Sequence, residues 1–216
     1  MKKELYLMPD ISYHNGNVNI KRVRDAGYGG IGLRVGYGKN NIDQKFVSNA
    51  TACVNLAVSA ITYWFSYALS VVMAEDEADY CCDQVDKYWQ ECPVAFDLEY
   101  DTVMYARTKG INITKDLATK MATAFLSKVK MRGHIPVIYT NRDYLRNYFD
   151  MDKIVSAVGT VYVWYARYNS TLTESEWNLA DIWQYTSSGS VPGISGKCDV
   201  NRVYTNLWLK STPAQR

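Results

Sequence analysis

The stretch PVAFDLEYD, residues 93–101, ends an apolar run in three acidic residues at alternate positions, Asp97, Glu99 and Asp101. If the whole stretch is a β-strand, the three carboxylates share one face and lie about 6.6 Å apart along the backbone. Carboxylates crowded in this way repel one another, and their burial is costly unless they are paired, hydrogen-bonded or protonated. The sequence therefore singles out this segment for a chemical role.

Carboxylates set among aromatic residues favour glycoside hydrolysis. This reaction needs one carboxylic acid to protonate the leaving oxygen and a carboxylate to stabilise or capture the cationic sugar. Further acidic residues accompany other apolar runs, Asp10 at the first and Asp199 at the last. Because neighbouring anions raise the pKa of an acid, we predict that Glu99 is the proton donor, with Asp97, Asp10 and Asp199 close to it.

The composition narrows the class of partner. The 24 basic and 22 acidic residues are spread along the chain and give a net charge of +2, with no basic block, so nucleic acid is not an expected partner. The 18 Tyr and 6 Trp favour a cleft for flat, partly polar molecules such as sugars. With only two His and no CxxC pair, we expect no metal site and no cofactor, and we expect the five Cys to be buried, reduced thiols.

Membrane and export signals are also missing from the pattern. No apolar stretch is long enough to cross a membrane, so we expect no membrane partner. The start, MKKELYLMPDIS, lacks the apolar core and the cleavage site of a signal peptide.

Short apolar runs alternate with longer amphipathic ones, which predicts an α/β fold with parallel strands. The expected strands are residues 5–11, 30–35, 59–65, 94–98, 135–139, 160–165, 182–185 and 199–203. The expected helices are residues 20–26, 43–56, 72–89 and 114–132. The later strands follow one another closely, which indicates a barrel whose last crossovers have lost their helices. In such a barrel the active site lies at the C-terminal ends of the strands.

The motifs DIS, DxE, IYTN, WxAxY, WQY and DxN occur in this order from about Leu5 to Asn201. This series resembles glycoside hydrolase family 25, the Chalaropsis-type lysozymes. The resemblance implies a flattened (β/α)5(β)3 barrel, over residues 1–210, followed by a polar tail, residues 211–216. It also implies an N-acetylmuramidase that cuts the β-1,4 bond between N-acetylmuramic acid and N-acetylglucosamine in peptidoglycan. We then expect a monomer that binds peptidoglycan glycan strands at the bacterial cell wall, after secretion or release by a phage.

Carried over to this chain, the resemblance makes Glu99 the general acid and Asp97 the residue that stabilises the transition state. Asp10 and Asp199 complete an acidic floor. The resemblance also implies retention of configuration, with the 2-acetamido group of the substrate as internal nucleophile and its N–H held by Asp97. Spacing along a strand does not fix the distance between carboxyl groups, so the sequence alone leaves retaining and inverting geometries open.

Five further residues are candidates for sugar contact: Tyr63, Arg34, Tyr139, Trp164 and Gln184. If Tyr63 faces the cleft, Phe65 shares its face and Trp64 does not, because side chains alternate along a strand. Arg34 either binds a carboxylate of the muramic residue or forms an ion pair with Asp10.

Several alternatives stay open from the sequence. Asp97 and Glu99 could form a structural ion pair with Arg107, and Asp10 and Asp199 could serve turns. Trp64 stands where the family commonly has His, which leaves the groove shape open and with it a glycosidase acting on another N-acetylhexosamine polymer such as chitin. The third possibility is a non-catalytic glycan-binding barrel.

Overall fold

A computed structural model describes residues 2–168 and 171–207, and in this part of the chain eight strands close into one barrel. The strand order is β1-β9-β8-β7-β6-β5-β4-β2, and pairing of β1 with β2 closes the ring. The strands are β1 (Tyr6–Ile11), β2 (Ile31–Tyr37), β4 (Ala60–Phe65), β5 (Pro93–Asp97), β6 (Ile135–Asn141), β7 (Tyr162–Ala166), β8 (Ile182–Gly189) and β9 (Cys198–Val203). The two-residue β3 (Asn41–Ile42) pairs with the edge of β2.

Within the barrel, β1, β2 and β4 to β8 run parallel, and β9 is antiparallel to both of its neighbours. The predicted α/β barrel is therefore confirmed, and each of the eight expected strands is present. The parallel strands all direct their C-terminal ends toward one rim, so residues distant in sequence meet there.

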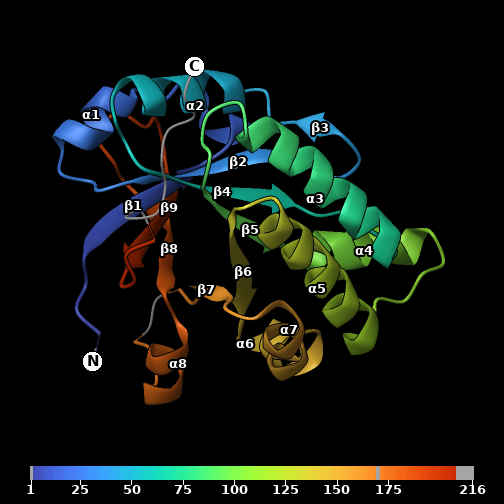
Figure 1. Ribbon diagram of the computed structural model, residues 1–216. Helices are drawn as coiled ribbons and strands as arrows, with labels where there is room; N and C mark the ends of the chain where they lie inside the picture. Colours follow the sequence, from blue (N-terminus) through green and yellow to red (C-terminus); the bar gives the residue numbers. More distant parts are fainter. Residues whose placement is uncertain (1, 169–170, 208–216) are drawn as a thin grey trace.

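Helices cover the outside of the barrel, with α1 and α2 at the top and α3, α4 and α5 at the right of Figure 1. They are α1 (Ile20–Asp25), α2 (Phe46–Asn55), α3 (Val71–Val85), α4 (Tyr100–Thr108), α5 (Lys115–Met131), α6 (Arg142–Asn147), α7 (Met151–Val158), α8 (Glu174–Leu179) and the 3-10 turn η1 (Tyr13–Asn15). The two longest helices, α3 and α5, have side-chain caps at their N-termini. Ser70 accepts from the amide of Met73, and Thr114 accepts from the amide of Leu117.

The four expected helices are present, but α4, α6, α7 and α8 were not predicted. In α4 the apolar side chains of Tyr100 and Met104 are 49% and 62% exposed, so the helix lacks the clear apolar stripe from which a helix is predicted. The short α8 is the only helix between β7 and β8 in the described residues, and β8 passes to β9 without one. The last crossovers therefore contain little helix, in line with the expectation that they have lost their helices.

Apolar side chains fill the barrel on both sides of its wall. Met8, Ile61 and Val137 lie in an inner cluster, while Leu33, Trp64 and Phe96 belong to the larger core between strands and helices. The five cysteines are all buried and free, as expected. The barrel sheet is therefore packed on both of its faces, and this packing fixes the positions of the strand ends at the rim.

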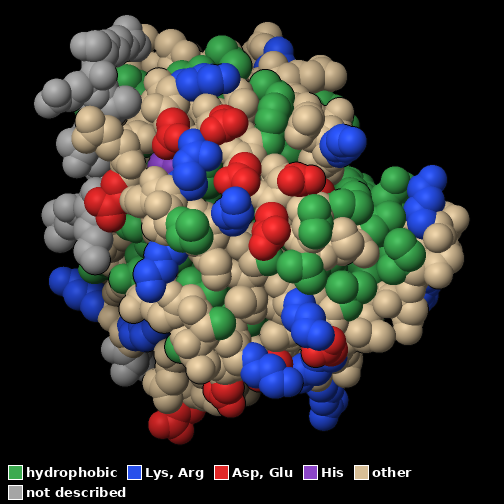
Figure 2. All heavy atoms as spheres, turned by 45° about the vertical axis from the view of Figure 1, so that its right-hand side comes forward, with side chains coloured by type: hydrophobic (Ala, Val, Ile, Leu, Met, Phe, Trp, Pro, Cys, Tyr) green, Lys and Arg blue, Asp and Glu red, His purple; other side chains and the backbone are tan. Residues whose placement is uncertain are grey.

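On the face shown in Figure 2, Lys and Arg side chains lie among Asp and Glu side chains and form no separate basic area. No described helix has the length and apolar character needed to span a membrane. The predicted tail, residues 211–216, lies outside the described residues.

Candidate active site

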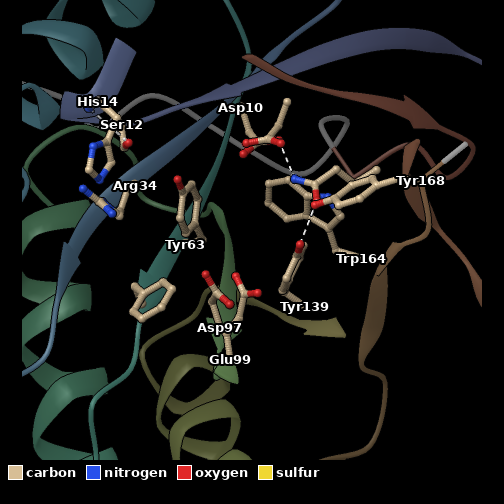
Figure 3. A pocket seen from close by; sticks show the side chains of 13 residues that line it. Asp10, Ser12, His14, Arg34, Tyr63, Asp97, Glu99, Tyr139, Trp164 and Tyr168 are labelled. Carbon is tan, nitrogen blue, oxygen red and sulfur yellow. Dashed lines mark hydrogen bonds between the residues drawn. The ribbon is translucent and has the colours of Figure 1, made fainter. Parts of the chain in front are cut away.

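A pocket of about 210 Å³ opens at the C-terminal rim of the barrel (Figure 3). Its lining residues come from β1, β2, β4, β5, β6, β7, β8 and β9 and from the loops that follow them: Asp10, Ser12, His14, Arg34, Tyr63, Phe65, Asp97, Glu99, Tyr139, Trp164, Tyr168, Gln184 and Asp199. All nine candidate residues predicted from the sequence are in this set. Asp101 is not, and it lies exposed in the first turn of α4.

The two acids of the DxE motif meet in a way that the sequence argument did not anticipate. Asp97 is the last residue of β5, whereas Glu99 lies beyond the strand, at the N-cap of α4. The prediction of three carboxylates on one strand face is therefore wrong, because the strand ends before the second of them. The chain turns instead, and it brings Glu99 close enough to Asp97 for the charge of Glu99 to raise the pKa of Asp97. Both side chains point into the pocket (Figure 3).

Asp10 is buried at the end of β1 and is held by two amide side chains. Its Oδ2 accepts from Gln184 Nε2 at 3.0 Å and from Asn201 Nδ2 at 2.8 Å. Other donors fix the orientation of both amides. The hydroxyls of Tyr139 and Tyr168 each donate to Gln184 Oε1 at 2.7 Å, and the indole Nε1 of Trp164 donates to Asn201 Oδ1 at 2.7 Å.

This network explains several residue types at the strand ends. Tyr139, Trp164 and Gln184 were predicted as sugar contacts, and the structure gives each of them a hydrogen bond that orients Asp10 or an amide bound to it. Asn201 and Tyr168 were not predicted as site residues. The signal was present, because both lie in the motifs DxN and WxAxY, but only the network reveals their partners.

Gly32 on β2 makes room for Asp10. A Cβ at this position would lie 2.4 Å from Asp10 Cβ and 2.9 Å from Trp164 Cη2. Gly32 and Asp10 are paired across the parallel strands β1 and β2, so neither can move without disturbing the sheet. The absence of a side chain here allows an acid and an indole to share the barrel interior.

Arg34 pairs with Asp43 and not with Asp10, which corrects one of the two alternatives predicted for it. Its Nε donates to Asp43 Oδ2 at 2.8 Å, and its guanidinium lies 5.0 Å from the ring centre of Tyr13 and 5.4 Å from that of Tyr37. Asp43 also accepts from the amide of Tyr13 at 3.0 Å. The ion pair thus holds a cation, with 11% of its side chain exposed, at the edge of an otherwise acidic pocket.

The alternation expected along β4 is confirmed. Tyr63 and Phe65 line the pocket, while Trp64 is fully buried in the core between strands and helices. Trp64, which left the shape of the groove open in the sequence, does not line the pocket, because its side chain lies on the other face of the barrel wall. Arg107 is exposed on α4 and forms no ion pair with either acid among the described residues.

Burial raises the pKa of every carboxyl in the pocket. For Glu99 burial and the charges of Asp101 and Asp10 raise the pKa to about 7. For Asp199 burial and the charges of Asp10 and Glu99 raise it to about 8. Burial is also the largest cause of the raised pKa of Asp97 and of Asp10. The pocket therefore retains protons near neutral pH, as a site that delivers a proton requires.

Within residues 2–168 and 171–207, no three His, Cys, Asp or Glu side chains are grouped so that they could hold a metal ion. The chemistry that the arrangement itself offers is proton transfer and stabilisation of positive charge.

Comparison with known proteins places these features in a family. The profile of glycosyl hydrolases family 25 matches residues 9–194. No significant match is found among curated protein sequences.

Solved structures with the same fold include the CTP1L endolysin, which is 25% identical, with a TM-score of 0.73 over 95% of this chain and 68% of that chain. The modular autolysin LytC from Streptococcus pneumoniae, solved with a synthetic peptidoglycan ligand, is 23% identical, with a TM-score of 0.73. The match covers 91% of this chain but 46% of LytC. A family 25 glycosyl hydrolase from Bacillus anthracis is 21% identical, with a TM-score of 0.76 over 96% of this chain and 92% of that chain.

Proposed function

The chain belongs to glycosyl hydrolase family 25, and we propose that this glycoside hydrolase is a lysozyme that cuts peptidoglycan. The bond would be the β-1,4 linkage from N-acetylmuramic acid to N-acetylglucosamine. The proposal draws on the endolysin and the autolysin that share the fold, the second of them solved with a peptidoglycan ligand. It places the catalytic unit in residues 1–210, acting as a monomer at the bacterial cell wall.

One observation carries the proposal: four carboxyl groups, those of Asp10, Asp97, Glu99 and Asp199, line one pocket of a barrel rim together with aromatic side chains. A structural role would not require four acids with raised pKa values in one cavity, since each unpaired buried charge destabilises the fold. Cleavage of a glycosidic bond does require an acid that is protonated near neutral pH and anions beside the developing cation.

In this proposal Glu99 donates its proton to the glycosidic oxygen as the C1–O bond breaks, and the bonding electron pair leaves with that oxygen. The pKa of about 7 keeps much of Glu99 protonated at neutral pH. After departure of the leaving group, the Glu99 carboxylate takes a proton from the water that attacks C1. The same residue thus acts first as acid and then as base.

The position of Asp97 favours assistance by the substrate's own acetamido group. The Asp97 and Glu99 carboxyls lie side by side and point into the pocket together (Figure 3), and in our proposal they do not stand on opposite faces of the anomeric carbon. Double displacement by a carboxylate pair requires a separation of about 5 Å, and inversion requires more. In our proposal the acetamido carbonyl oxygen attacks C1, Asp97 accepts a hydrogen bond from the acetamido N–H, and water then opens the cyclic intermediate with net retention.

The remaining residues would hold the sugar. Tyr63 lies near Asp10, Asp97 and Asp199 and presents a hydroxyl to the pocket. Tyr139, Trp164 and Gln184 would set the position of Asp10 and present edges to the ring, and Arg34 would contact an anionic substituent of the muramic residue. Asp10, which accepts hydrogen bonds from Gln184 and Asn201, would stabilise the positive charge that develops at C1. Asp199 would complete the acidic floor beside it.

The test is digestion of purified peptidoglycan, with borohydride reduction and mass spectrometry of the fragments. The wild type should release N-acetylmuramitol ends, Glu99→Gln should release almost none, and Glu174→Gln, which alters an exposed acid on α8, should match the wild type. N-acetylglucosaminitol ends would assign the other bond. Faster release from chitin oligomers than from peptidoglycan would refute the proposed substrate.

A further inference from the structure

The catalytic segment is tied to the loop that follows β4, residues 66–70. The amide of Ser66 donates to the carbonyl oxygen of Asp97 at 2.7 Å, and Thr102 Oγ1 donates to the carbonyl oxygen of Ser66 at 2.6 Å. Ser66 therefore joins the end of β4 to the end of β5 through its amide, and to α4 through its carbonyl oxygen. Both hydrogen bonds lie close to the acid pair.

Thr102 makes a second contact, to Glu99 itself. The amide of Glu99 donates to Thr102 Oγ1 at 3.4 Å, so this one hydroxyl joins the backbone of Glu99 to the backbone of Ser66. Thr102 and Ser66 are both fully buried. A buried hydroxyl that is at once donor and acceptor has a fixed orientation, because each hydrogen bond determines the direction available to the other.

The loop to which Thr102 is joined is itself anchored. The amide of Tyr67 donates to Glu77 Oε1 at 3.1 Å, and the amide of Ala68 donates to Ser66 Oγ at 3.1 Å. Glu77 is 3% exposed and lies on α3, one of the long helices packed against the barrel. The anchoring therefore runs from a rigid helix, through the loop, to the catalytic segment.

Glu99 needs such support because it lies beyond the end of β5. Asp97 is held in the sheet between Phe65 and Tyr139, but Glu99 is two residues further along the chain. We propose that Thr102 is a positioning residue, whose buried hydroxyl holds the Glu99 backbone so that the carboxyl stays beside Asp97. This inference rests on the proposed role of Glu99 as the general acid.

The experiment compares kcat, KM and the pH profile of kcat for Thr102→Val, which keeps the side-chain shape and removes the hydroxyl. Soluble glycan oligomers from peptidoglycan serve as substrate. We expect kcat to fall about 10- to 100-fold, with KM within about twofold, because misplacement of the acid affects the chemical step more than binding. The alkaline limb of the profile should move to lower pH, since a Glu99 carboxyl that leaves the pocket loses the burial that raises its pKa. Thr102→Ser, which retains the hydroxyl, should recover most of the wild-type kcat.

Thr119→Val is the matched control. Thr119 is also a buried threonine whose hydroxyl joins two backbone groups, since it donates to Tyr148 O at 3.4 Å and accepts from Asp150 N at 3.0 Å, but neither partner lines the pocket. Its loss should lower stability and leave kcat and the pH profile unchanged.

The proposal is overturned if Thr102→Val keeps the wild-type kcat and pH profile, or if Thr102→Ser is as impaired as Thr102→Val. Thr102→Ala, which removes the same hydroxyl without a new methyl group facing Ser66, carries the same test if Thr102→Val does not fold. Wild type and Glu99→Gln are assayed alongside. If the wild type releases no reducing ends, or if Glu99→Gln remains active, the proposed function fails rather than the role of Thr102.

Discussion

Glu99→Gln should stabilise the folded protein, and the gain should grow as the pH rises. Burial and nearby anions raise the pKa of Glu99 from 4.5 to about 7. A folded state that holds this proton more tightly than the unfolded chain is favoured below about pH 4.5, and this contribution is lost as the pH rises through about 7. Glutamine has nearly the same shape and carries no charge, so it removes the penalty.

The magnitude follows from the shift. One unit of pKa corresponds to about 1.4 kcal/mol, so a fully ionised Glu99 destabilises the fold by about 3 kcal/mol at pH 8. Glu99 is partly exposed, and screening by solvent reduces the expected gain of Glu99→Gln to about 2 kcal/mol at pH 8. At pH 4.5 the gain should be below about 0.5 kcal/mol, because the carboxyl is then protonated in the folded state.

Urea unfolding followed by tryptophan fluorescence at pH 4.5 and pH 8 measures both values. Glu174→Gln serves as the control, since it removes an exposed carboxylate and should change the free energy of unfolding little at either pH. A gain for Glu99→Gln that is absent at pH 8, or equal at the two pH values, would refute the reasoning that the pocket imposes a charge penalty on this acid.

Three further predictions concern the pocket and the residues that support it. The rate of hydrolysis by the wild type should fall as the pH rises through about 7, because Glu99 must carry a proton, and a rate that stays constant to pH 9 in initial-rate assays would contradict this role. Gly32→Ala should lower the free energy of unfolding in urea by about 2 kcal/mol or more, because the new Cβ would lie 2.4 Å from Asp10 Cβ; a neutral effect would show that the two strands can separate. Arg34→Met should cost about 3 kcal/mol in the same assay by leaving Asp43 buried without its cation, and Arg34→Lys should cost less; equal losses would show that shape rather than charge matters there.

Much of the barrel could be predicted from local patterns. Each strand is a short apolar run, and burial on both faces of a parallel strand requires such a run, so the eight strands were evident. The short helices were not. In α4 the exposed Tyr100 and Met104 obscure the apolar stripe, and α6, α7 and α8 span only six, eight and six residues, too few for a periodic pattern to stand out. Their boundaries depend on packing against neighbouring elements, which a local pattern does not contain.

For the candidate site, the sequence predicted the residues but not how two of them meet. The chemical types at the strand ends identified Asp10, Asp97, Glu99 and Asp199, and these residues meet because parallel strands bring their C-terminal ends to one rim. The reason first given for Asp97 and Glu99, a shared strand face, was wrong, since a turn and not a strand brings them together.

The sequence by itself determined the barrel class, the family resemblance and the types of residue at the rim, because these depend on apolar periodicity and on motifs that can be recognised one at a time. Only the tertiary structure decided which partner each of those residues has. Arg34 pairs with Asp43, Asp10 is held by Gln184 and Asn201, and Thr102 joins Glu99 to Ser66. The physical reason is that a hydrogen bond depends on atoms being about 3 Å apart in a fixed orientation, and the residues concerned are brought to that distance by closure of the sheet and not by their separation along the chain.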